Sequence, residues 1–163
     1  MHREGHVGAA LLVYAPLGTW LAGTGYPGAA LLGAATMIAF ASVPDVDERL
    51  PLVAHRGVTH TFLFALAFGG ALGLVGLQFA TAVPKGSWGP TTPARFGFLL
   101  GTLSVLTHVA ADALTPMGVA PLWPLSRSRI SLSLTRAANP VANYALLVAG
   151  VLASGAGLLV AAG

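Results

Sequence analysis

Residues 61–83, TFLFALAFGGALGLVGLQFATAV, decide the fold of this 163-residue chain. The stretch has no charged side chain, and a helix of this length crosses the roughly 30 Å hydrocarbon core of a bilayer. The whole chain has the same character, since 55% of its residues are hydrophobic, 8% are charged and the mean hydropathy is +0.78. So few charges cannot cover a soluble domain of this size. The sequence therefore predicts an integral membrane protein.

Four further apolar segments accompany this one, and proline-rich turns separate them. Thr92-Pro93 and Asn139-Pro140 each place a capping residue before a proline at the first helical position. The segment after residue 6 leads directly into the next one, as in a helical hairpin, so we expect no cleaved signal peptide. We expect an all-α membrane protein with a single domain, residues 1–163, and five transmembrane helices at about residues 7–23, 28–43, 61–83, 94–114 and 140–161.

The connection between the fourth and fifth segments has a different pattern. Ile130, Leu132 and Leu134 alternate with hydroxyl side chains, which is the period of a strand. We expect a short interfacial hairpin here. Trp123 is typical of a membrane interface, and the arginines of this connection suit head-group phosphates.

Five crossings place the N-terminus and the loops at residues 44–60 and 115–139 on one face of the membrane. This face carries most of the basic residues, Arg3, Arg49, Arg56, Arg127, Arg129 and Arg136, whereas the other face carries Lys85 and Arg95. The positive-inside rule then predicts a multi-pass protein of the cell membrane with a cytoplasmic N-terminus and an external C-terminus. The net charge of +3 forms no basic stripe, so head groups are expected as anionic partners and nucleic acid is not.

Every histidine and every acidic residue falls on the same predicted face. They are His2, His6, His55, His60 and His108, with Glu4, Asp45, Asp47, Glu48 and Asp112. The chain has no cysteine, so a metal would need imidazole, carboxylate or water as ligands. The sequence therefore favours a polar cluster with metal-binding chemistry on the cytoplasmic side.

His108 and Asp112 give the clearest pair in this set. They are four residues apart in an apolar helix, so they share one helix face and could grip one ion. An imidazole and a carboxylate at membrane depth are costly unless they are paired, hydrated or metal-bound. The competing interpretation is a helix-to-helix hydrogen bond without metal.

Two loop motifs add further ligand types. In Pro44-Asp45-Val46-Asp47 the two carboxylates could face one cation, or they could form a solvated helix cap. In His55-Arg56-Gly57-Val58-Thr59-His60 two imidazoles bracket a guanidinium, which otherwise would suit interface anchoring. His2 and His6 share a helix face if the first helix begins early, and His6 is the stronger candidate. Glu4 and Glu48 are expected at the solvated rim.

Together these motifs, with Pro121-Leu122-Trp123-Pro124-Leu125-Ser126, resemble the YdjM-type, LexA-regulated family of membrane-bound metal-dependent hydrolases. The resemblance covers residues 1 to about 136. It implies a divalent metal site formed by His6, Asp45, Asp47, His55, His60, His108 and Asp112. The mixture of ligands is also similar to that of the phospholipase C and P1 nuclease group, which implies phosphoester hydrolysis.

We therefore expect a metal-dependent hydrolase of a phosphoester in a lipid or lipid-linked substrate. One or two ions, zinc by ligand type or else manganese, would activate a water molecule. Arg56 is the expected partner of the phosphate oxygens, with Arg127 and Arg129 as weaker candidates. Asp45 and His60 are the candidate catalytic acid-base residues. A serine acyl-transfer enzyme is disfavoured because the chain has no Gly-x-Ser-x-Gly elbow.

Two other classes of protein compete with the hydrolase. An ion- or proton-handling transporter would use intramembrane His108 and Asp112 as a relay. A relay should continue across the bilayer, whereas the ligand-type residues stop at one face. A passive structural or adaptor protein would require all these side chains to be incidental. The sequence carries no signal for an oligomeric state.

Overall fold

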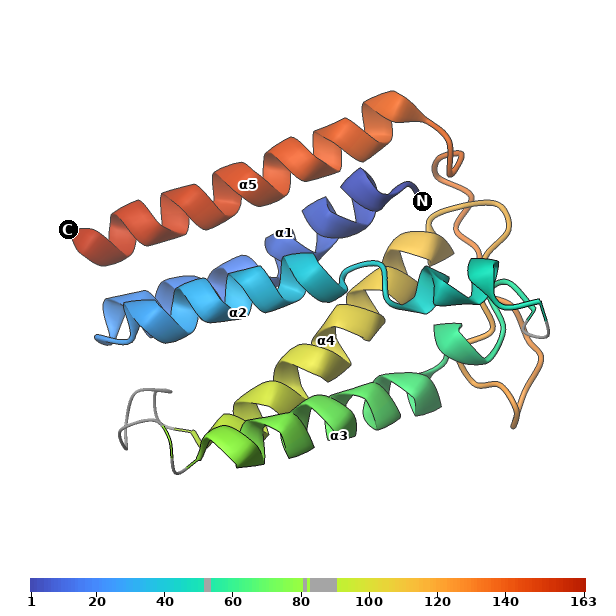
Figure 1. The fold of residues 1–163 in the computed structure, drawn as a ribbon. Helices are drawn as coiled ribbons and strands as arrows, with labels where there is room; N and C mark the ends of the chain where they lie inside the picture. Colours follow the sequence, from blue (N-terminus) through green and yellow to red (C-terminus); the bar gives the residue numbers. More distant parts are fainter. Residues whose placement is uncertain (52–53, 81, 83–90) are drawn as a thin grey trace.

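The computed structural model describes residues 1–51, 54–80, 82 and 91–163, and these form an all-helical protein (Figure 1). Its five long helices are α1 (Arg3–Gly23), α2 (Pro27–Phe40), α3 (Phe62–Phe79), α4 (Pro93–Ala113) and α5 (Pro140–Ala162). Two 3-10 turns, η1 (Pro44–Arg49) and η2 (Val58–His60), lie between α2 and α3. Within the described ranges, five segments are long and apolar enough to cross a membrane, and the second of them runs from Pro27 to Arg49. The five-helix prediction is confirmed.

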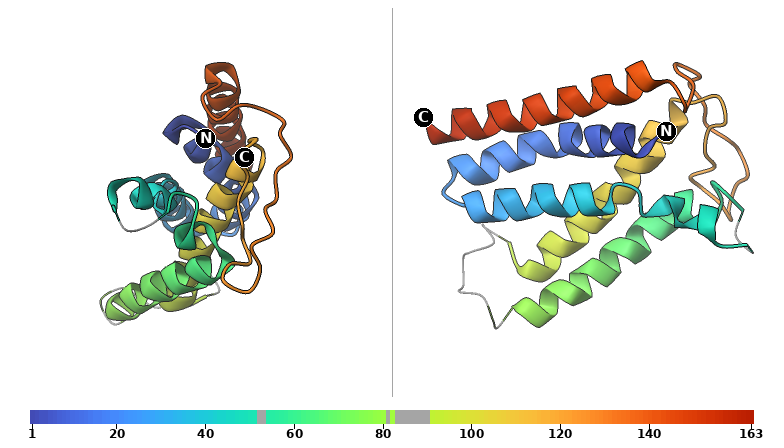
Figure 2. Two further views of the ribbon diagram at one scale, coloured as in Figure 1. Left: turned by 90° about the vertical axis from the view of Figure 1, so that its right-hand side faces the viewer. Right: turned by 45° about the horizontal axis from the view of Figure 1, so that its top comes forward.

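The helices pack as two close pairs, α1 with α5 and α3 with α4, and α2 lies against α1 and α4 (Figures 1 and 2). The largest buried apolar cluster lies where α1, α2 and α4 meet, and Tyr14, Met37 and Leu100 belong to it. Small residues allow the close approach. A Cβ at Gly101 of α4 would lie 2.9 Å from the Cα of Gly69 on α3. Such contacts suit helices in lipid, where association depends on van der Waals packing.

The helix ends differ from the predicted ones for local reasons. The second helix stops at Phe40 instead of residue 43, because Pro44 lacks an N–H and its ring would clash with the carbonyl four residues earlier. The first begins at Arg3, with Glu4 in the first turn, where a carboxylate interacts favourably with the helix dipole. The third stops at Phe79, and its predicted end at Val83 lies outside the described residues.

The predicted interfacial hairpin is reduced to one antiparallel bridge, in which the backbones of Val119 and Ile130 exchange hydrogen bonds of 3.0 and 2.8 Å. No strand forms among the described residues of this connection. The alternating segment instead donates from Leu132 to the carbonyl of Ala113 and from Leu134 to that of Leu114. It thereby satisfies carbonyls at the end of α4 that have no partner inside the helix.

One end of the helix bundle collects the N-terminus, the described residues of the connection between α2 and α3, and the long connection before α5, whereas the C-terminus lies at the opposite end (Figure 1). This arrangement matches the prediction that the N-terminus and the loops at residues 44–60 and 115–139 lie on the same face of the membrane. Among the basic residues assigned to the other face, Arg95 lies in the first turn of α4 and Lys85 lies outside the described residues.

The orientation in the membrane is a prediction that reporter fusions can test. Because arginines concentrate on the face of the N-terminus, fusions in the 115–139 connection and after Gly163 should report the cytoplasm and the exterior respectively. The measurement is paired alkaline phosphatase and fluorescent protein fusions in cells. Reports from the same side for both positions would contradict the five-crossing topology.

Candidate metal centre

The cluster is built on the last turns of α4, where His108 and Asp112 lie one turn apart on the same face. Both side chains are fully buried. The Nδ1 of His108 donates a hydrogen bond to the carbonyl oxygen of Ala41, at 2.8 Å, just where α2 has ended. This bond determines the tautomer, so the Nε2 atom carries a lone pair directed away from α2.

His60 is oriented in the same way by a different partner. The Thr59 hydroxyl donates to Asp47 Oδ2 at 2.7 Å, so its oxygen is left to accept from His60 Nδ1 at 3.0 Å. The Asp47 carboxylate also lies 3.3 Å from this ring nitrogen. His60 therefore presents Nε2 as the free nitrogen, like His108.

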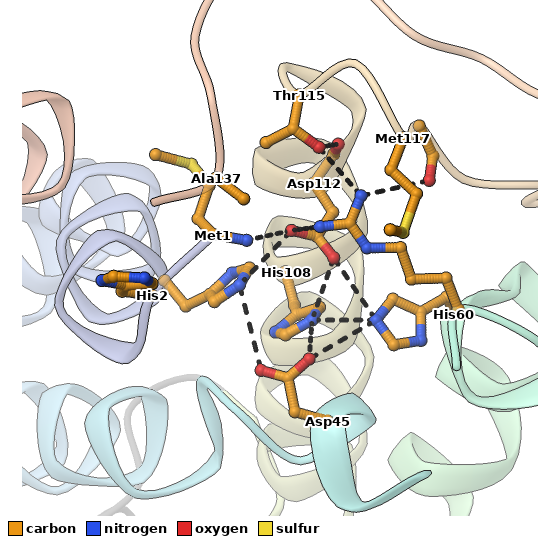
Figure 3. A network of polar contacts seen from close by, with 12 residues as sticks. Met1, His2, Asp45, His60, His108, Asp112, Thr115, Met117 and Ala137 are labelled. Carbon is orange, nitrogen blue, oxygen red and sulfur yellow. Dashed lines mark hydrogen bonds and ion pairs between the residues drawn. The ribbon is translucent and has the colours of Figure 1, made fainter. Parts of the chain in front are cut away.

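These two lone pairs face each other, with the Nε2 atoms of His60 and His108 3.1 Å apart (Figure 3). Two carboxylates border the same space. Asp45 Oδ1 is 3.2 Å from His108 Nε2 and 3.6 Å from His60 Nε2, and the corresponding distances from Asp112 Oδ2 are 3.7 and 3.4 Å. Lone pairs and negative charges at such distances repel one another unless a proton or a cation lies between them.

The spacing fits a metal ion. Ligand atoms about 2.0–2.1 Å from a tetrahedral ion lie roughly 3.3–3.4 Å from one another, which is the middle of the observed range of contacts. Burial opposes protonation of His60, yet the carboxylates of Asp112 and Asp45 raise its pKa above the ordinary value. The surroundings of this ring therefore favour a positive charge, which a bound cation would supply in place of the proton.

His6 joins the cluster from α1. Its ring stacks on that of His108 with a centroid distance of 3.7 Å, and its Nε2 lies 3.5 Å from Asp112 Oδ1 and 3.9 Å from Asp45 Oδ2. The ring is 1% exposed, and neither of its nitrogens has a hydrogen-bond partner among the described residues. A buried polar ring without a partner is costly, so this orphaned imidazole is a direct indication of a missing ligand or ion.

Asp45 is the one residue of this group with substantial solvent access, since His6, His108 and Asp112 are buried and Asp45 is 23% exposed on its side chain. It borders a cavity of about 680 Å³ that opens on the loop face. Residues from both the N-terminus and the η1 region line this cavity, among them Arg3, Glu4, Glu48 and Arg49. Solvent and ligands can therefore reach the cluster from the side of Asp45.

Three of the seven predicted ligands lie outside the group of His6, Asp45, His108 and Asp112, whose ligand atoms lie within 4.8 Å of one another. One of the three, His60, borders this group through its Nε2 atom. Asp47 is buried, but its oxygens already accept from the backbone N–H of Arg56 at 2.9 Å, from Thr59, and from His55 Nδ1 at 3.0 Å. Asp47 therefore helps to orient the His60 ring through the Nδ1 atom, on the opposite side of the ring from the Nε2 atom that borders the cluster. His55 is partly exposed and, with Asp45 and Glu48, belongs to a second and more open group of ligand atoms within 4.8 Å of one another. Metal binding by any of the seven stays a prediction.

Arg56 lies against a carboxylate of the cluster. Its backbone has a φ of 57°, which is uncommon for a residue with a side chain, and the Asp47 carboxylate holds its N–H in that conformation. The guanidinium is buried and donates from Nη2 to Asp112 Oδ1 at 2.8 Å. It thus pairs with a carboxylate of the cluster, and its expected contact with a substrate phosphate stays a prediction.

Several residues that position the cluster were absent from the predicted set. Thr115 accepts from Arg56 Nη1 at 2.8 Å, and the Met1 amine contacts Asp112. Asn143 of α5 accepts from the backbone N–H of His2 at 3.0 Å and so anchors the start of α1. The side chain of His2 itself is exposed and lies beside the cluster (Figure 3). A buried asparagine in an apolar helix is the signal that could have identified Asn143.

Comparison with known proteins now adds to this geometry. The family model described as "YdjM inner membrane protein" matches residues 1–162. The chain belongs to this family. The inner membrane protein YdjM of Escherichia coli K12 is 37% identical over 93 residues, and the same values hold for that of Shigella flexneri. The alignment covers 55% of this chain and 41% of each relative, so it spans less than half the length of these relatives. No solved structure matches the chain.

Membership of the YdjM family and the five apolar helices agree on a multi-pass membrane protein. The resemblance drawn from the sequence motifs is thereby confirmed at the level of the family. The buried His and Asp group of this YdjM-family chain has the residue types and spacing to hold a metal ion.

Proposed function

We propose that this YdjM-family protein is a metal-dependent hydrolase that cleaves a phosphoester in a lipid or lipid-linked substrate at the membrane surface. The observation that carries the proposal is that His6, Asp45, His108 and Asp112 hold their ligand atoms within 4.8 Å of one another beside an open cavity. The Nε2 atom of His60 borders this group, 3.1 Å from that of His108. A divalent ion bound there would act as a Lewis acid and lower the pKa of a coordinated water. Imidazole and carboxylate ligands favour zinc, with manganese as the alternative.

The chain's own residues supply orientation and proton transfer. The Ala41 carbonyl and the Asp47 carboxylate engage the Nδ1 atoms of His108 and His60, which leaves each Nε2 available to a bound ion. Arg56 holds the Asp112 carboxylate in place through a hydrogen bond of 2.8 Å. Asp45 borders the cavity, so its carboxylate is placed to take a proton from an entering water. Arg3 and Arg49 line the same cavity together with Glu4 and Glu48, and the two arginines are the candidate contacts for an anionic substrate.

The transporter alternative is less well supported by the arrangement of charges. No histidine or carboxylate occurs in the sequence beyond the cluster on the way to the other membrane face. The interior there is formed by apolar side chains such as Leu21, Ala30 and Phe96. A proton or metal relay needs successive polar stations across the bilayer, so the cluster fits a pocket better than a conduit.

Elemental analysis tests the proposal directly. The purified wild-type protein should carry about one divalent ion per chain, and His108→Ala should lose it because one of the converging nitrogens is gone. His2→Ala is the matched control, since it removes an exposed imidazole at the same end of the bundle and should retain the metal. Hydrolysis of a generic phosphomonoester and phosphodiester should follow metal content. Wild-type protein without stoichiometric metal after gentle purification would refute the proposed function.

A further inference from the structure

A second cavity lies on the other side of Arg56 from the metal cluster, and the proposed reaction does not use it. Its volume is about 260 Å³, and it is lined by Arg56, Gly57, Ala120, Trp123, Arg127 and Arg129. Half of the lining residues are arginines, and no carboxylate is among them. A concave site bordered by three arginines and no acidic residue has the charge to attract an anion.

Arg56, the buried arginine of this cavity, has one N–H group without a hydrogen-bond partner among the described residues. Arg56 is 4% exposed and uses Nη2 for Asp112 and Nη1 for Thr115 and the carbonyl of Gly118. Its Nε, which is also buried, has no hydrogen-bond partner in the described part of the chain. An unpaired N–H on a buried cation is costly, and an anion oxygen in the adjoining cavity would satisfy it.

The two exposed arginines are likewise without counter-ions. None of the ion pairs among the described residues involves Arg127 or Arg129, and Arg129 donates only to the backbone carbonyl of Met117, at 3.0 Å. All five acidic residues of the chain lie elsewhere, four of them in or near the metal cluster. Asp112 balances the charge of Arg56, but no carboxylate among the described residues balances the charges of Arg127 and Arg129.

The surroundings indicate where the anion comes from. Leu125 is 92% exposed beside the cavity, and Leu122, Leu132 and Leu134 of the same connection also present their side chains outward. Trp123, a residue that prefers the membrane interface, lines the cavity itself. Exposed leucines next to unpaired arginines match the boundary between acyl chains and head groups, where basic pockets bind anionic lipids.

We propose that this arginine cavity binds the phosphate of an anionic lipid head group, separately from the metal cluster. Phosphate oxygens would accept from Arg56 Nε, Arg127 and Arg129, while the acyl chains would lie along the exposed leucines. The site would hold the connection before α5 at the level of the lipid head groups. Only the guanidinium of Arg56 would then separate the bound phosphate from Asp112. This binding does not depend on hydrolysis or on the bound metal.

Trp123 provides the reporter for the test. In full-length protein carrying Trp20→Phe and Trp88→Phe, it is the single remaining tryptophan. The protein in neutral detergent, with EDTA present to prevent hydrolysis, is titrated with dioctanoyl phosphatidic acid, with dioctanoylglycerol and with inorganic phosphate. Saturable change in Trp123 emission is expected with phosphatidic acid at far lower concentration than with either of the other two.

Paired variants identify the cavity. Removing two charge-assisted hydrogen bonds in Arg127→Gln/Arg129→Gln should weaken phosphatidic acid binding about tenfold or more. Arg136→Gln, an exposed arginine of the same connection outside the cavity, should change it less than about twofold. Equal affinity for dioctanoylglycerol, or full binding by the double variant, would overturn the proposal. Inorganic phosphate binding as tightly as the lipid would overturn the lipid assignment.

Metal content of the double variant separates this proposal from the hydrolase. Because Arg127 and Arg129 do not touch the cluster, the double variant should keep the wild-type amount of metal while losing the lipid. A protein that binds phosphatidic acid but carries no metal would refute the hydrolase alone. A protein that carries metal but shows no arginine-dependent binding would refute the lipid site alone.

Discussion

Asp112→Asn is expected to remove the metal and to destabilise the protein by about 3–5 kcal/mol, which is the usual cost of breaking a buried ion pair. Asp112 is 1% exposed and faces both the cluster and the buried guanidinium of Arg56 at 2.8 Å. Asparagine keeps the size of the side chain but leaves the arginine without a counter-ion. Metal content and the thermal midpoint in detergent are the two measurements.

A second variant separates the two effects. Asp112→Asn/Arg56→Met removes both members of the ion pair, so most of the lost stability should return while the metal does not. If Asp112 served only as an anchor for Arg56, both variants would retain wild-type metal content. That outcome would exclude Asp112 as a ligand and shift the weight toward a structural role for this part of the cluster.

Gly150→Ala is expected to have the second large effect, a destabilisation of about 1–3 kcal/mol with partial loss of metal. A Cβ at Gly150 of α5 would overlap the carbonyl oxygen of Gly8 on α1 and lie 3.0 Å from the Cβ of Leu11. The backbone is the obstacle, so no rotamer change relieves the clash. Because α1 carries His6, displacement of α1 would disturb the cluster.

Gly155→Ala is the matched control in the same helix. A Cβ at this position would meet no atom within 4 Å, so the substitution should be neutral or slightly stabilising through helix propensity. Thermal unfolding in detergent and metal analysis of both variants test the difference. Equal behaviour of the two variants would contradict the close packing of α1 against α5.

The gross architecture could be predicted because it depends on local sequence. Each span shows itself by its own apolar length, and Pro44, Pro93 and Pro140 mark ends that follow from a missing N–H. Counting the crossings then assigns every histidine and acidic residue to one end of the bundle, and this step needs no information about helix packing. The strand-like period at residues 130–135 does not correspond to a strand, since tertiary hydrogen bonds to the end of α4 produce the same alternation as a sheet.

The sequence by itself determined five membrane crossings, one polar end and the types of ligand available, because hydropathy and covalent order act residue by residue. Only the tertiary structure decided which side chains meet. In the folded protein Asp47 accepts from the Arg56 backbone and lies at the Nδ1 side of His60, and the Arg56 guanidinium pairs with Asp112. These choices depend on contacts between residues nine to more than fifty positions apart in the chain. No periodicity records such distant contacts, because they arise only when packed helices bring separate loops together.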